Sequence, residues 1–182
     1  MKKNYEEIIS NYNGGDLDLS GCAIKHLELG NIEGSLNLSK CVIDKLSIGW
    51  VSREINLSGA EIKSFLTPID ADSVNMFGSK LKKLPEHIYT GSLNMEKSSV
   101  EKLNTEIRTN VLNISNTKIQ QLPKSLRVNT LVVDSKVAKN LSLSVMNQCS
   151  ELVIDGRSYS YHNNSDFNFC SVNSEVHECA CV

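Results

Sequence analysis

One pattern repeats seven times in this chain at a strict spacing of 19 residues. Each repeat contains an apolar-x-apolar pair, and two further apolar positions follow five and eight residues after it. The pairs are Leu17/Leu19, Leu36/Leu38, Ile55/Leu57, Val74/Met76, Leu93/Met95, Leu112/Ile114 and Leu131/Val133. A unit of about 20 residues can bury its apolar side only against its neighbours, so the pattern predicts a solenoid.

Within each repeat, the alternating stretch predicts a short strand whose two aliphatic side chains point inward. The strands of successive repeats are expected to stack in parallel. The segment that returns to the next strand is too short for a full helix, and it contains prolines 68, 85 and 123, which suit an extended or single-turn segment. The predicted fold class is therefore an α/β solenoid with a parallel sheet on one side and a short extended or single-turn convex side.

The two ends depart from the repeat. Tyr5, Ile8, Ile9 and Tyr12 fall on one face of a helix that Gly14 and Gly15 would stop. At the other end, residues 151–154 read as a last strand, and Asp155-Gly156 could begin a hairpin. The expected divisions are a cap helix at 1–15, seven repeats at 16–141, a C-terminal cap with a last strand or hairpin at 142–162, and a flexible tail at 163–182.

Composition limits the functions that the chain can have. A net charge of −2 over 182 residues argues against a dedicated nucleic-acid binder, which would carry a basic surface. No apolar run approaches the roughly 18 residues of a membrane span, and lysines and acids without an apolar core at the N-terminus make a cleaved signal peptide unexpected. The six cysteines lack paired spacing, so we expect thiols in a reducing compartment, with Cys22 and Cys41 stacked in the core.

The stretch from Leu17 to Leu27, L-x-L-x-x-C-x-I-x-x-L, resembles the leucine-rich repeat, with Cys, Ala, Ser or Thr at the usual asparagine position. The stretch L-P-x-x-L-x-x-x-x-L-x-V from Leu122 to Val133, together with Leu84-Pro85-x-x-Ile88, is similar to the short repeats of bacterial leucine-rich effector proteins. The resemblance covers roughly residues 4–155. It implies a concave sheet face that binds proteins and action inside a host cell, without the ubiquitin-ligase domain that some of these effectors carry.

Five successive asparagines occupy the outward position between the paired aliphatics. Stacked amides about 4.8 Å apart could simply bond one another, or the neutral stripe could be a recognition surface. The candidate partner-binding residues on this face are Asn37, Asn56, Asn75, Phe77, Asn94, Glu96 and Asn113.

A column of lysines follows the predicted strands and would form a basic rim. Asp44, Glu61 and Glu101 interrupt the rim, as in an ordinary solvated surface. The alternative is a footprint for an acidic protein, a membrane surface or, least in keeping with the lack of aromatics, a nucleic acid. The candidate rim residues are Lys45, Lys63, Lys82, Lys83 and Lys102.

The last four residues, Cys179-Ala180-Cys181-Val182, fit the C-a-a-X prenylation pattern, with Cys179 as the lipidated residue. An inert tail and a metal site formed by His177, Cys179 and Cys181 are the alternatives, the latter needing a fourth ligand from elsewhere. A lipidated tail would place the protein on a host membrane.

The sequence gives little support for a catalytic function. The four histidines have no neighbouring nucleophile and acid in a recognisable arrangement, and the sequence contains no glycine-rich phosphate loop. We therefore expect no catalytic residues, no cofactor and no resident metal. The leading hypothesis is a non-enzymatic module that binds a partner protein through its concave face, in the cytoplasm or in a host cytosol. The alternatives are a lipidated peripheral membrane protein and an enzyme acting through the basic rim.

Overall fold

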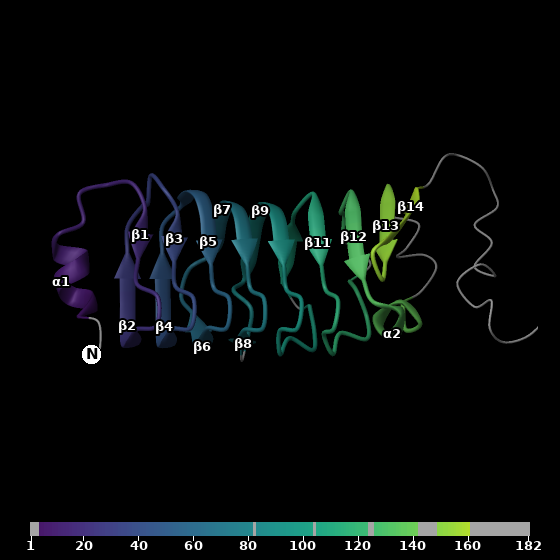
Figure 1. Ribbon diagram of the computed structural model, residues 1–182, viewed down its shortest axis with the longest axis horizontal. Helices are drawn as coiled ribbons and strands as arrows, with labels where there is room; N and C mark the ends of the chain where they lie inside the picture. The colour runs from purple at the N-terminus through teal and green to yellow at the C-terminus, as the bar shows by residue number, and fades with distance from the viewer. Residues whose placement is uncertain (1–3, 82, 104, 124–125, 142–148, 161–182) are drawn as a thin grey trace, which may run out of the picture.

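The computed structural model describes residues 4–81, 83–103, 105–123, 126–141 and 149–160. Over these residues the chain forms a parallel β-solenoid of about seven turns with few helices. The turns stack side by side along one long axis, with the N-terminal helix at one end (Figure 1). The solenoid predicted from the 19-residue period is therefore confirmed.

Every turn contributes at least one strand to a long first sheet, which is ten-stranded in the described residues. Its register follows the sequence period, because Leu36 pairs with Ile55 and Val74 pairs with Leu93. Neighbouring strands are parallel except for the last pair. The strands are β1 (Leu17–Asp18), β3 (Leu36–Asn37), β5 (Val51–Asn56), β7 (Ile69–Asn75), β9 (His87–Asn94), β10 (Glu106–Arg108), β11 (Val111–Asn113), β12 (Thr130–Val133), β13 (Glu151–Ile154) and β14 (Arg157–Ser160).

A second parallel sheet, which the sequence pattern did not predict, forms another wall of the first turns. It contains β2 (Ala23–Leu29), β4 (Val42–Ile48), β6 (Glu61–Phe65) and β8 (Lys80–Leu81), in that order. In β2 the buried residues are Ile24, Leu27 and Leu29, so two exposed residues separate the first two of them. The strict alternation of a strand is lost there, which is why the pattern resembled a return segment.

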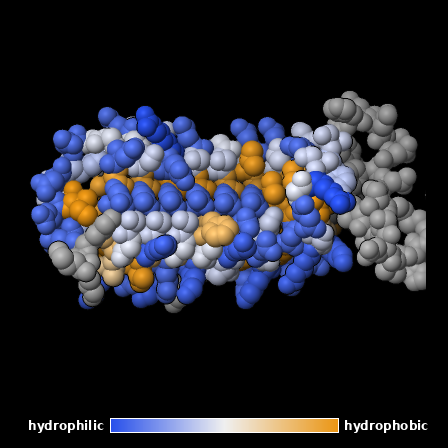
Figure 2. Space-filling model, in the orientation of Figure 1, coloured by the Kyte–Doolittle hydropathy of each residue, from blue (hydrophilic) through white to orange (hydrophobic). Residues whose placement is uncertain are grey.

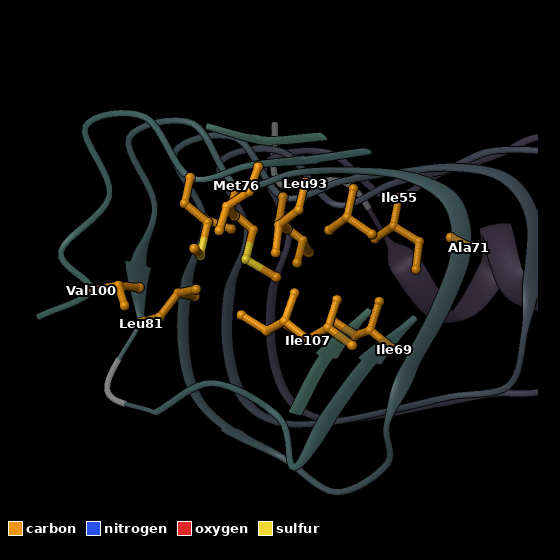
Figure 3. Packing of buried hydrophobic residues seen from close by; sticks show 14 of the residues in the cluster. Ile55, Ile69, Ala71, Met76, Leu81, Leu93, Val100 and Ile107 are labelled. Carbon is orange, nitrogen blue, oxygen red and sulfur yellow. The ribbon is translucent and has the colours of Figure 1, made fainter. Parts of the chain in front are cut away.

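The core is a continuous apolar column between the walls. Met76, Leu93 and Ile55 point inward from one side of the core (Figure 3). Ile107, from β10 of the same sheet, and Leu81, from β8 of the second sheet, approach from other sides. Where the chain leaves the first sheet, the inward position is small in successive turns. The residues there are Cys22, Cys41, Ala60, Ser79, Ser98 and Thr117, all buried.

Three cysteines lie in the described part of the solenoid, and all three are buried. Cys22, Cys41 and Cys149 form no disulfide. Burial raises the pKa of the Cys41 thiol, and burial also raises the pKa of Cys149 to about 11. Both thiols are therefore protonated at neutral pH and act as small core side chains rather than nucleophiles.

Different elements occupy the two ends of the solenoid. Helix α1 (Tyr5–Ser10) packs Tyr5, Ile8 and Ile9 against the core. In the seventh turn of the solenoid, the short helix α2 (Ser135–Ala138) follows the strand of the first sheet. The Asp134 side chain caps this helix by accepting hydrogen bonds from the backbone N–H groups of Lys136 and Val137. Strands β13 and β14 then form an antiparallel hairpin. No helix in the described ranges is long and apolar enough to span a membrane.

Candidate functional site

The asparagine ladder, which consists of Asn37, Asn56, Asn75, Asn94 and Asn113, lies along the outer face of the first sheet. Each Oδ1 accepts a hydrogen bond from the backbone N–H two residues later, over 3.0 to 3.1 Å. Such a bond closes an Asx turn. The asparagines therefore shape the bend that ends each strand, a role that stacking alone did not suggest.

One pair of ladder amides also bonds side chain to side chain, since the Asn94 Nδ2 group donates to the Asn75 Oδ1 atom at 3.3 Å. All five asparagines are partly exposed. A row of hydrophilic residues runs along this face, beside a row of hydrophobic ones (Figure 2). The ladder is thus both a structural element and a continuous polar surface.

The residue two positions after each ladder asparagine forms a second outward column. It is Ser39, Ser58 and Ser115 in three turns, but Phe77 and Glu96 in the middle. Phe77 is 37% exposed, and the Lys97 Nζ atom lies 4.9 Å from its ring centroid. Lys97 also forms an ion pair with Glu96 at 3.3 Å. The predicted face therefore carries an aromatic side chain and two opposite charges at its centre.

We expect Asn75→Ala to lower the free energy of unfolding by about 1 kcal/mol, because the backbone N–H of Phe77 loses its acceptor. Asn75→Asp keeps an acceptor oxygen at the same place, so it should lower the free energy of unfolding clearly less than Asn75→Ala does. Urea denaturation followed by circular dichroism measures both values. Equal losses in the two variants would contradict the role of the Oδ1 atom in the turn.

The structure places the described lysines of the predicted basic rim on the second sheet and in the turns that follow it. Lys45 and Lys63 lie within β4 and β6, so they project from the outer face of the second sheet. Lys63 pairs with Asp44 at 2.6 Å, and this partner raises the pKa of Lys63. Lys83 and Lys102 are exposed and follow in the next turns, while Lys82 lies outside the described residues. The outer face of this sheet therefore carries charges of both signs.

A further outward column lies near the start of the strands of the first sheet. Asp70 pairs in register with Tyr89, Tyr89 with Arg108, and Arg108 with Arg127. Trp50 lies beside Asp70, because the residues that follow them, Val51 and Ala71, are paired. The sequence reasoning missed this column, although Asp70, Tyr89, Arg108 and Arg127 follow one another at the repeat spacing.

Side chains of the column are held by mutual contacts. The Arg108 guanidinium lies 5.3 Å from the Tyr89 ring centroid and contacts Glu106 at 2.7 Å. His87 stacks on Tyr89 with ring centroids 5.9 Å apart, and its Nδ1 atom lies 3.2 Å from Glu106. The hydrogen bond from Arg108 lowers the pKa of Glu106, with His87 adding to the effect. Glu106 is therefore ionised at neutral pH and fixes the position of Arg108.

Two open hollows adjoin this column and share Tyr89 and Thr90. One, of about 670 Å³, is lined by Trp50, Asp70 and Asp72, among others. The other, of about 1060 Å³, is lined by Arg108, Arg127 and neighbouring threonines and asparagines. In the described residues, no group of histidine, cysteine and acidic side chains is arranged to hold a metal ion. Cys179, the candidate lipidation site, lies outside them.

Comparisons of the chain with protein-family models, with curated proteins and with solved structures found no match.

Proposed function

We propose that this protein is a non-enzymatic module that binds a partner protein through the outer face of its first sheet. The observation that carries the proposal is the exposure of Phe77 in a column that is mostly serine. A solvent-exposed aromatic residue contributes nothing to the core, whereas aromatic side chains are common anchors at the centres of protein interfaces. The partly exposed amides on both sides of it supply polar groups around this anchor.

The surroundings of Phe77 support the same use. Ladder amides recur about every 4.8 Å along the solenoid, so they present donors in a straight row. Glu96 and Lys97 add one charge of each sign beside the ring. A partner that covers Phe77 would meet an apolar centre, a polar border and a charge pair, which together provide specificity.

The experiment is to immobilise the wild-type protein and the Phe77→Ser variant and to measure which proteins each of them retains from a cell lysate. Serine occupies this position in neighbouring turns, and the hydrogen bond from the backbone N–H of residue 77 to Asn75 does not need the ring, so the fold should survive. We expect the recovery of specific partners to fall by about tenfold or more in the variant, as it does when a central aromatic anchor is removed from an interface.

The matched control is Val42→Ser, which removes an apolar side chain that is 46% exposed on the second sheet. Proteins retained by the wild type should also be retained by this variant. Undiminished recovery with Phe77→Ser, measured by quantitative mass spectrometry, would contradict the proposal. The leucine-rich effector setting and the lipidated tail remain predictions from the sequence, and loss of the lipid mass in Cys179→Ser would test the latter.

A further inference from the structure

The charge-divided groove, formed by the two hollows beside Trp50, Asp70, Asp72, Tyr89, Arg108 and Arg127, is separate from the asparagine ladder. Asp70, Tyr89 and Arg108 are register neighbours on successive turns, so positions along the groove repeat about every 4.8 Å. The groove therefore runs along the solenoid axis, across the strands. Its two halves differ in charge.

The acidic half combines carboxylates with aromatic rings. Asp70 and Asp72 are exposed, and neither forms an ion pair with any residue in the described ranges. Trp50 is 43% exposed and lines the same hollow as both aspartates and Tyr89. A carboxylate pair next to an open indole is suited to a lysine or arginine side chain, which gains from charge and from the aromatic face together.

The basic half presents two guanidinium groups from neighbouring turns, since Arg108 and Arg127 are bridged in register. Arg108 is oriented by Glu106 and Tyr89, yet its side chain is still 72% exposed. A guanidinium group held in one orientation can receive a carboxylate through two parallel hydrogen bonds at reduced entropic cost. This half therefore favours an acidic side chain.

We propose that the charge-divided groove binds an extended segment of a partner polypeptide with one basic and one acidic side chain about four residues apart. An extended chain advances about 3.3 Å per residue, so side chains four positions apart lie on the same side and about 13 Å from each other. The distance from Asp70 to Arg127 is three turns, or about 14 Å. The basic side chain occupies the Trp50 end and the acidic side chain the Arg127 end.

Trp50 is the single tryptophan of the chain, so its fluorescence reports on the groove directly. The probe is a set of short peptides with randomised flanks and a fixed lysine and glutamate four positions apart, titrated into the full-length protein. Matched sets carry two lysines or two glutamates at these positions. We expect the lysine–glutamate set to change the fluorescence at the lowest concentration, and equal responses from the three sets would overturn the proposal.

Charge reversal provides the second arm. The double variant Asp70→Lys/Asp72→Lys should bind the lysine–glutamate set about tenfold more weakly, because the lysine of the peptide then faces lysines in the formerly acidic half. The glutamate–glutamate set should become the preferred one, because both of its side chains then face basic groups. A structural defect would weaken all sets alike, and unchanged preference would overturn the proposal. Phe77→Ser should leave peptide binding intact, so this proposal and the proposed function of the first sheet can fail separately.

Discussion

Replacing Leu57 with alanine is expected to lower the free energy of unfolding by about 2 to 5 kcal/mol. Leu57 is fully buried and follows β5 directly, in a turn of the solenoid that has neighbours on both sides. Each turn buries its apolar side only against those neighbours, so a cavity at this position weakens the contacts of the turn on both of its faces. The measurement is urea denaturation followed by circular dichroism.

A matched control exists directly after β6, where Leu66 is 52% exposed. The same leucine-to-alanine change at Leu66 should cost less than about 1 kcal/mol, because little apolar surface returns to water. Fluorescence of Trp50, which lies in the same turn as Leu57, shows whether the loss is local or global. Similar losses for the two variants would contradict the position assigned to Leu57.

Periodicity alone was enough to predict the first sheet. Because side chains 19 residues apart have the same environment, the repeat spacing by itself places Leu93 beside Val74 and Leu112, and the strand register agrees. The same reasoning places the asparagine ladder and Phe77 on one outward surface. It did not predict that each amide oxygen closes a turn, because stacked amides can bond either to one another or to the backbone.

The second sheet was missed for a local reason. In β2 and in β4, two successive exposed or half-exposed residues separate the first buried pair, as at Lys25 and His26. Both strands make the same irregular step, so their pairing is kept while the alternation is lost. As a consequence Lys45 was assigned to a rim, although it lies on a sheet.

The charge-divided groove has no signature in the hydrophobic pattern, which marks only the apolar residue of each return segment. Ile69, Ile88 and Ile107 follow one another at the repeat spacing, and all three are buried. The outward neighbours of these isoleucines, Asp70, Tyr89 and Arg108, carry the chemistry of the groove. Residues of opposite charge in one column give no periodic signal, so their relation becomes visible only when the register places them side by side.

Gly34→Ala is expected to destabilise the protein by about 1 to 3 kcal/mol or more, as overpacking does. A Cβ atom on Gly34 would collide with the Asp16 carboxylate and with the backbone of Gly15 in the preceding turn. The Asp16 side chain cannot simply move away, because its Oδ1 atom accepts the backbone N–H of Ser35 at 2.7 Å. Relief of the collision therefore requires either a lost hydrogen bond or a wider spacing between the first two turns.

The corresponding residue of the third turn shows how the chain accommodates a side chain there. Arg53 stands 19 residues after Gly34, and β5 has a register shift between Val51 and Glu54 around it. Gly30→Ala is the control, since a Cβ atom at Gly30 has no neighbour within 4 Å. We expect that variant to change the free energy of unfolding by less than about 1 kcal/mol. Urea denaturation of both variants measures the difference, and a Gly34→Ala protein as stable as the Gly30→Ala protein would show that the first turns do not pack as closely as the structure indicates.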